Sequence, residues 1–254
     1  MSLCKDCFSG VTYEGTAKGK IEEIGGVRCY VAVPEVEYPK DNVVLFFSDL
    51  YGIDFINNQL LADDFARNGF KVIAPDYLHG DPGPATALDP GSTFDVNGWF
   101  AKHDVDTTVM PLVDKIIVAL RDESEHAVKR IGVTGYCFGA RPAFNYALKN
   151  EVDVVVVSHP SLLKVPEDFE AYKLKSKAPL LMNTGEFDTL FPIPSRDKAV
   201  EILGNGKFSP GFEWTYWPGC RHGFAVRGDL SNPLVKAGKE GAFKAAVEFF
   251  EKHL

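Results

Sequence analysis

The sequence predicts one doubly wound α/β domain over residues 1–254, built on a single, mostly parallel sheet of about seven or eight strands with helices on both faces. Three observations favour this fold class. A chain of 254 residues with 45% hydrophobic composition can bury one substantial core. Short apolar runs alternate with stretches of helical spacing, which is typical of a parallel sheet covered on both faces. No internal repeat or low-complexity block interrupts this pattern, and we expect residues 1–14 to form a loosely packed N-terminal arm.

The first half of the chain is expected to begin at one edge of the sheet. Short strands are predicted at residues 18–24 and 27–33, and the Gly25-Gly26 pair between them favours a hairpin that adds an antiparallel edge. The run VVLFF at residues 43–47 predicts a buried strand. Residues 54–68 follow with helical spacing, and KVIAP at residues 71–75 predicts the next strand.

A loop and a long helix are expected before the central strand. Residues 80–98 are rich in Pro, Gly and Asp, which predicts a loop over one end of the sheet. Helical spacing covers residues 105–121, RIGVT at residues 130–134 predicts a strand, and residues 140–149 predict a helix.

The same alternation continues to the C-terminus. VDVVVV at residues 152–157 and PLLMNT at residues 179–184 predict two strands, and residues 194–203 predict a helix. FEWTYW at residues 212–217 predicts a late strand, and residues 235–253 a closing helix. Because ligands of such sheets bind at the carboxyl ends of the strands, the residues just after each strand are the candidates for a functional site.

Composition narrows the function classes and the compartment. The formal net charge of −8 leaves no excess of Lys and Arg to neutralise phosphates, so we expect no nucleic-acid partner. No stretch approaches the roughly 20 apolar residues that span a bilayer, and the N-terminus lacks a signal-peptide core, which predicts a cytoplasmic protein without a membrane partner. Five cysteines do not resemble a disulfide framework. Cys4 and Cys7 lack a second ligand pair at zinc spacing, so we expect no metal site there.

A candidate nucleophile follows the strand expected at residues 130–134. Residues 135–139, GYCFG, are the cysteine version of the nucleophile elbow, in which glycines permit a tight turn between strand and helix. The central Cys137 is expected in a strained conformation that exposes its side chain above the sheet. The N-terminus of the following helix favours a thiolate. The alternative is a buried structural cysteine beside two packing glycines.

A candidate acid and base follow in the chain order of an α/β-hydrolase, which is nucleophile, acid, histidine. Asp188 lies in the loop after the strand at residues 179–184, and we favour it over Glu186 because it lies farther into the loop. His222 follows the strand at residues 212–217. In this triad His222 would take the thiol proton of Cys137, and Asp188 would fix the imidazole tautomer. The thiolate would attack an ester or lactone carbonyl and give an acyl-enzyme.

Other polar groups near the strand ends have candidate roles. The backbone N–H groups of Phe138 and Leu50 are the expected oxyanion-hole donors. His159 follows the strand at residues 152–157, and it either lines the pocket, donates a hydrogen bond to the substrate, or bonds to a loop carbonyl as a structural residue. Arg141, on the elbow helix, is expected to be structural, for example by pairing with a buried acid.

Aromatic side chains are candidates for the pocket wall or the core. Tyr136 and Phe224 belong to the motifs around Cys137 and His222, which favours a place in the pocket. Trp99 and Phe100 have no such motif and are as consistent with the core.

Several motifs in chain order resemble the dienelactone hydrolase family. They are SDLYGI at residues 48–53, APDY at 74–77, GYCFGA at 135–140, GEFDTLFP at 185–192 and HGFA at 222–225. The resemblance covers the chain from roughly residue 15 onward, and the extended start CFSGVTYEGT at residues 7–16 is similar to the eukaryotic, fungal-type branch. The resemblance implies an α/β-hydrolase fold and hydrolysis of a small ester or lactone, without a metal or organic cofactor.

The resemblance also implies roles for matching positions. The triad and oxyanion-hole positions match the residues named above. Asp49 stands where the bacterial enzymes have a glutamate that contacts the resting thiol, and the alternative is a loop acid that caps the next turn. Those enzymes bind the substrate carboxylate with an arginine four residues after the triad histidine. That position is Val226 here, and the following Arg227 is either a shifted substrate-binding residue or a solvated one.

Three function hypotheses remain from the sequence. The first is an ester or lactone hydrolase acting on a small molecule, as a monomer or homodimer. The second is a thioesterase or a broad detoxifying esterase on the same triad. The third is a redox-sensing or binding protein in which Cys137 is reactive without turnover.

Overall fold

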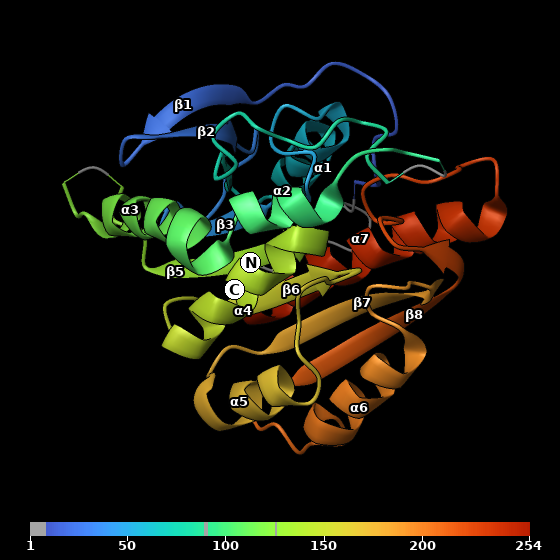
Figure 1. Ribbon diagram of the computed structural model, residues 1–254. Helices are drawn as coiled ribbons and strands as arrows, with labels where there is room; N and C mark the ends of the chain where they lie inside the picture. The colour runs from blue at the N-terminus through green and yellow to red at the C-terminus, as the bar shows by residue number, and fades with distance from the viewer. Residues whose placement is uncertain (1–8, 89–90, 125) are drawn as a thin grey trace.

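In the residues that the structure describes, eight strands form one sheet in the computed structural model of the protein (Figure 1). The described residues are 9–88, 91–124 and 126–254, so Cys4, Cys7 and the start of the expected N-terminal arm lie outside them. The strands are β1 (Lys20–Ile24), β2 (Val27–Ala32), β3 (Asn42–Phe47), β4 (Val72–Pro75), β5 (Arg130–Tyr136), β6 (Val154–Ser158), β7 (Leu180–Phe187) and β8 (Phe212–Arg221). The helices are α1 (Ile56–Arg67), α2 (Val96–Lys102), α3 (Met110–Arg121), α4 (Ala140–Lys149), α5 (Glu167–Lys175), α6 (Ile193–Leu203) and α7 (Pro233–His253).

The order of the strands is that of a doubly wound sheet. It runs β1-β2-β4-β3-β5-β6-β7-β8. The pairs β1–β2 and β2–β4 are antiparallel, and every other neighbouring pair is parallel. The structure therefore confirms the predicted mostly parallel sheet and its antiparallel edge hairpin.

Helices cover both faces of the sheet because alternate strand residues point to opposite sides. In β3, Val43, Leu45 and Phe47 pack in a core with helices α3 to α6. Val44 and Phe46 pack on the other side with α1 and α7. This alternation explains why the strands are near-continuous apolar runs in the sequence.

Two helices were not predicted. Helix α2 begins inside the expected loop at residues 80–98, where Asp95 caps it by accepting a hydrogen bond from Gly98 N–H. Helix α5 buries only Phe169 and Tyr172, so its sequence has little helical periodicity to detect. The helix expected at residues 105–121 begins with a π-helical turn, Val105–Val109, before α3.

The last two strands are longer than expected. Strand β7 continues to Phe187 and β8 to Arg221, because the two strands resume pairing after an irregularity between Gly185 and Phe187, with Phe187 opposite Arg221. Prolines and glycines in these segments favoured loops, but pairing with a neighbouring strand outweighs that local preference. Asp188 and His222 are therefore the first residues after two paired strand ends.

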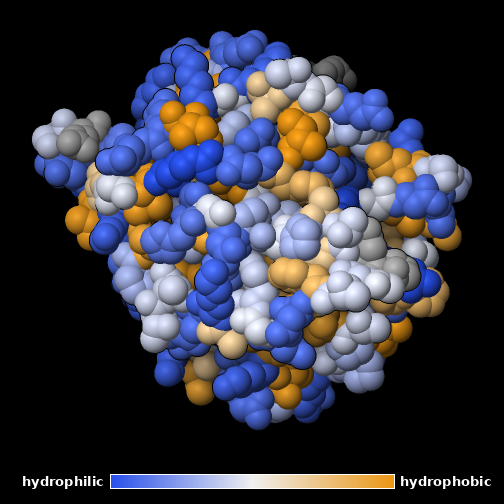
Figure 2. Space-filling model, turned by 45° about the horizontal axis from the view of Figure 1, so that its top comes forward, coloured by the Kyte–Doolittle hydropathy of each residue, from blue (hydrophilic) through white to orange (hydrophobic). Residues whose placement is uncertain are grey.

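On the face drawn in Figure 2, apolar side chains occur in small groups among polar ones. None of the helices in the described part of the chain is long and apolar enough to cross a bilayer.

Residues 9–12 are held against α1, since Ser9 N–H donates to Asn68 and Thr12 N–H donates to Asp64.

Candidate active site

Cys137 occupies a sharp turn between β5 and α4. Its φ is 51°, a left-handed conformation that is uncommon for a residue with a side chain. A Cβ added at Gly135 would lie 2.5 Å from the carbonyl oxygen of Gly139. A Cβ added at Gly139 would lie 2.2 Å from the carbonyl oxygen of Phe47 in β3. Both glycines are thus required by close backbone contacts, as the elbow motif predicts.

His222 and Asp188 lie together because they follow paired strand ends. The Nδ1 atom of His222 is 2.9 Å from both carboxylate oxygens of Asp188. Asp188 is itself oriented by two backbone donors, the N–H groups of Leu190 at 2.9 Å and Phe191 at 3.0 Å. The Asp188 side chain is 1% exposed and that of His222 is 11% exposed, so the pair is shielded from bulk water. This geometry fixes an imidazole with Nδ1 protonated and Nε2 turned away from the acid.

Cys137 and His222 interact through charge. The Nε2 atom of His222 is buried and has no well-aligned hydrogen-bond partner among the described residues. Burial alone would lower the pKa of His222, but the negative charge of a Cys137 thiolate and the hydrogen bond with Asp188 outweigh it and raise that pKa. The arrangement therefore favours a protonated His222 whenever Cys137 is ionised.

Ser161 is a polar neighbour of Cys137 that sequence reasoning missed. Its Oγ lies 3.7 Å from Cys137 Sγ, and its N–H donates to the Cys137 carbonyl at 3.1 Å. Ser161 lies in the loop after β6, and β6 pairs directly with the elbow strand β5. A hydroxyl residue shortly after the neighbouring strand was the feature that could have identified it.

Asp49 lies in the loop after β3 and caps the turn that follows. Its Oδ1 accepts hydrogen bonds from Tyr51 N–H and from Asn58 Nδ2, both at 3.0 Å. Burial is the main cause that raises the pKa of Asp49 to about 6, although these hydrogen bonds and the charges of Arg227 and His222 oppose it. The capping role that the sequence left open is therefore present, and Asp49 is also close enough to feel the charge of His222.

The two expected oxyanion-hole residues flank the elbow. Phe138 follows Cys137, and Leu50 lies in the loop after β3, whose last residue Phe47 pairs with Gly135. The carbonyl of Leu50 accepts from Gly83 N–H at 2.8 Å, which fixes this loop against residues 80–83. Both residues are buried.

Helix α2 contributes two aromatic rings to this region. The centroid of the Trp99 ring lies 5.3 Å from that of Phe138, and that of Phe100 lies 5.9 Å away in a stacked arrangement. The centroid of the Tyr77 ring, which follows β4, lies 6.0 Å from that of Phe138. The two α2 rings belong to no recognisable sequence motif, because their neighbour Phe138 is near them only in the fold.

His159 is packed against His222 and not against a loop carbonyl. It is fully buried, with ring centroids 5.1 Å from His222, 5.6 Å from Phe224 and 5.9 Å from Tyr136. Neither of its ring nitrogens has a hydrogen-bond partner among the described residues. Burial first, and then the charge of His222, lower the pKa of His159 well below the ordinary value, so the ring is neutral.

Tyr136 and Phe224, which we expected in the pocket wall, lie in the core shared with α1 and α7. Tyr136 is 2% exposed and stacks on Phe46 at 4.9 Å. Strand alternation explains this outcome, since Tyr136 precedes Cys137 and points to the opposite face. Both rings thus pack against the ring of His159.

The loop after His222 is held by two side chains. Lys239 Nζ in α7 donates to the Val226 carbonyl at 2.9 Å, and Asn57 Nδ2 in α1 donates to the same oxygen at 3.1 Å. The Val226 side chain is fully buried. Its neighbour Arg227 lies with its guanidinium 4.5 Å from the centroid of the Tyr51 ring and donates to the carbonyl of Ala85 at 3.1 Å.

Two further charged candidates have structural partners. Glu186 accepts a hydrogen bond from Gly219 N–H at 2.8 Å, so it ties the ends of β7 and β8 together, and the partner of His222 is Asp188. Arg141 forms a 2.6 Å ion pair with Asp168, as expected of a structural residue. In the ranges that the structure describes, no group of three or more His, Cys, Asp or Glu side chains is arranged to hold a metal ion.

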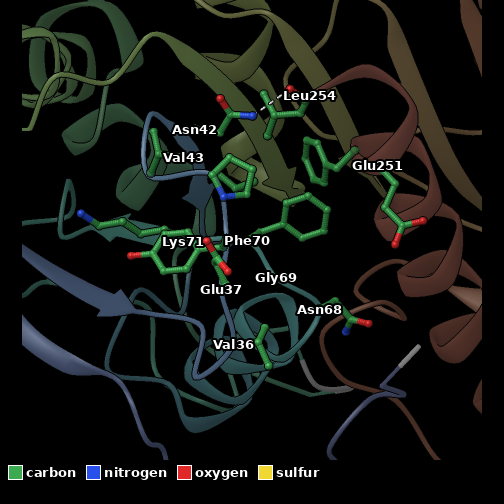
Figure 3. Close-up of a pocket in the computed structure, with 14 residues that line it drawn as sticks. Val36, Glu37, Asn42, Val43, Asn68, Gly69, Phe70, Lys71, Glu251 and Leu254 are labelled. Atoms are coloured by element: carbon green, nitrogen blue, oxygen red, sulfur yellow. Dashed lines mark hydrogen bonds between the residues drawn. The ribbon is translucent and has the colours of Figure 1, made fainter. Parts of the chain in front are cut away.

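A cavity of about 730 Å³ lies at the other end of the sheet, where β3 and β4 begin (Figure 3). Phe70, Phe250 and Leu254 form part of its lining, and Asn42 Nδ2 donates to the Leu254 carbonyl across it. None of the candidate site residues lines it. Parallel strands carry their sites at the carboxyl ends, so this cavity is separate from the site around Cys137.

Comparisons with known proteins agree on one family. A family model described as the dienelactone hydrolase family matches residues 27–254. Hydrolase pyvD from Aspergillus violaceofuscus is 32% identical over 250 residues, which cover 98% of this chain and 96% of that protein. Dienlactone hydrolase 1 from Gibberella moniliformis is 30% identical over 252 residues, covering 98% of this chain and 92% of that protein.

The fold also agrees with a solved structure. A putative dienelactone hydrolase from Klebsiella pneumoniae superposes with a TM-score of 0.66 at 21% sequence identity, covering 88% of this chain and 92% of the other. At this identity the likeness concerns the fold alone.

Proposed function

Since the chain belongs to the dienelactone hydrolase family, we propose that it hydrolyses a small carboxylic ester or lactone through a covalent acyl-enzyme on Cys137. The family makes this protein a hydrolase of ester bonds. The nucleophile, the triad and the acyl-enzyme are our inference from the site.

One observation carries the proposal. A buried Asp188–His222 pair lies at the carboxyl ends of β7 and β8, the charge of a Cys137 thiolate raises the pKa of His222, and Cys137 is held at φ 51° after β5. A structural cysteine needs neither a strained turn nor an oriented imidazole. The combination supports general-base activation of the thiol.

The reaction then proceeds in two balanced stages. His222 Nε2 takes the thiol proton, and the thiolate adds to the substrate carbonyl to give a tetrahedral oxyanion. Collapse breaks the bond to the alkoxy oxygen, which receives the proton from His222. Water, deprotonated by His222, next attacks the thioester, and the carboxylic acid leaves as Cys137 is regenerated. In a lactone the alcohol and the acid remain parts of one molecule.

We assign the binding of the oxyanion to two backbone N–H groups. The N–H of Phe138 lies beside the nucleophile, and the N–H of Leu50 comes from the loop that abuts the elbow. Fixed donors of this kind stabilise developing charge without reorganisation, and the loss of one costs about 100- to 1,000-fold in rate.

The substrate class is proposed as small esters and lactones, without a requirement for a carboxylate. Val226 is buried at the position where the resemblance places an arginine, and Arg227 is engaged with Tyr51 and Ala85.

Cys29, Cys137 and Cys220 are free thiols, which fits a reducing compartment such as the cytosol.

The test compares hydrolysis of p-nitrophenyl acetate and of a small dienelactone by wild type and Cys137→Ala. We expect turnover of the ester by wild type and its loss in the variant. Cys29→Ala, which removes a buried thiol in β2, is the matched control and should remain active. If wild type hydrolyses the ester but not the dienelactone, the natural substrate is an ester or lactone of another kind. Equal activity or equal inactivity of wild type and Cys137→Ala contradicts the proposal and favours the sensor or binding hypothesis.

A further inference from the structure

The sulfur of Cys137 has a hydroxyl partner that the triad does not explain. Cys137 is 2% exposed, so its sulfur lies away from bulk water, and Ser161 Oγ lies 3.7 Å from it. Ser161 is equally buried, at 2% exposure. A buried hydroxyl facing a nucleophilic sulfur is in a position to act on its protonation.

The backbone holds this hydroxyl in place. Ser161 N–H donates to the Cys137 carbonyl at 3.1 Å, so the loop after β6 is tied to the elbow itself. His159 N–H donates to the Asn183 carbonyl at 2.9 Å, which fixes the start of the same loop to β7. The loop also contains two left-handed residues, His159 at φ 40° and Leu162 at φ 61°. Ser161 is therefore presented by a specific, strained backbone path.

The direction of the hydrogen bond depends on the state of Cys137. In the neutral pair either the thiol or the hydroxyl donates. A thiolate has no proton, so Ser161 must then donate to sulfur. A hydrogen bond to an ionised acceptor is roughly twice as strong as one between neutral groups, so this contact favours the thiolate over the thiol.

Other titratable or charged groups face the same site from each neighbouring segment. They are Asp49 and Tyr51 after β3, Tyr77 after β4, His159 after β6, Asp188 after β7, and His222 and Arg227 after β8. His222 becomes a cation when it takes the thiol proton, whereas Ser161 supplies a neutral donor from the β6 side. The two contributions are thus separable by mutation.

We propose that Ser161 is a positioning residue whose hydroxyl donates a hydrogen bond to the Cys137 thiolate and thereby favours its formation. This inference rests on the proposed function in taking Cys137 as the nucleophile. It adds a fourth side chain to the site and explains why a hydroxyl residue lies at this point of the loop.

The test is the pH dependence of alkylation of the wild-type, Ser161→Ala and Ser158→Ala proteins by iodoacetamide, read at Cys137 by peptide mass. In this reaction the thiolate displaces iodide and forms a carbon–sulfur bond, so the rate follows the thiolate fraction. The Ser161→Ala change removes one oxygen atom. Ser158→Ala is the matched control, because Ser158 is also a buried serine at the end of β6 but its hydroxyl accepts from Asn183.

We expect the midpoint of the Ser161→Ala profile to rise by about one pH unit, which slows alkylation about tenfold below the midpoint. The two rates should converge at high pH, whereas a merely structural defect would lower the rate at every pH. Ser158→Ala should keep the wild-type midpoint. An unchanged midpoint in Ser161→Ala, or the same shift in Ser158→Ala, would overturn the proposal. Alkylation needs no turnover, so it tests the role of Ser161 even if the wild type hydrolyses no ester. A failure of the proposed hydrolysis appears instead in the wild-type activity assay.

Discussion

Replacing His159 by Phe should make the protein less sensitive to acid. His159 is fully buried between Tyr136, Phe224 and His222, and both of its ring nitrogens lack partners in the described part of the chain. Burial lowers the pKa of His159 well below the usual value in the folded protein. A Phe ring preserves the aromatic packing and removes the titration.

The sign follows from proton linkage. The unfolded chain takes up a proton on this residue below its unfolded pKa of about 6.5, while the folded protein does not. The contribution of His159 to stability is therefore full above about pH 6.5 and is lost as the pH falls. Between about pH 7 and about pH 5.5 the loss amounts to about 1.3 kcal/mol for a ring that stays neutral when folded.

The assay is urea unfolding of wild type, His159→Phe and Tyr136→Phe at these two pH values. His159→Phe should lose about 1.3 kcal/mol less free energy of unfolding than wild type over the interval. Tyr136→Phe changes a ring neighbour that does not titrate in this range, so it should follow wild type. Equal acid sensitivity of His159→Phe and wild type would refute a neutral, buried His159.

Three further predictions concern the elbow and the acids. Asp188→Asn should lower kcat for p-nitrophenyl acetate by about 1,000-fold or more, because an amide favours the wrong imidazole tautomer; a loss below about tenfold would refute the role. Gly139→Ala should cost more than about 3 kcal/mol in urea unfolding, since its Cβ would lie 2.2 Å from the carbonyl oxygen at the end of β3, whereas Gly10→Ala, with no atom within 4 Å, should be neutral. Asp49→Asn should stabilise the protein at about pH 7 by up to about 3 kcal/mol, because burial raises the carboxyl pKa to about 6 and its ionisation then opposes folding. That gain should disappear below about pH 4, and its persistence there would contradict the assignment.

The most productive part of the sequence interpretation was the search for functional residues directly after each predicted strand. Cys137, Asp188 and His222 each lie directly after a strand, as the strand-end placement used to predict them requires. The exact strand ends were not predictable, because β7 and β8 extend through prolines and glycines by pairing with each other. The same pairing explains why Asp188, and not Glu186, meets His222.

What the sequence missed depends on contacts between distant segments. Ser161 and Cys137 are separated by 24 positions, and only the pairing of β5 with β6 brings them together. The rings of α2 reach Phe138 from a segment whose composition favours a loop. Motif membership predicted Tyr136 near the site, whereas alternation along β5 directs its side chain into the core shared with α1 and α7.

The most direct test of the central claim is to trap the acyl-enzyme. Wild type and Cys137→Ala are mixed with p-nitrophenyl acetate, quenched in acid within the first turnovers, and mapped by peptide mass. The account predicts one acetyl group on the peptide that contains Cys137 in wild type, and no acetylated site in the variant. Continued hydrolysis without an acetyl group on Cys137, or by the Cys137→Ala variant, would contradict it.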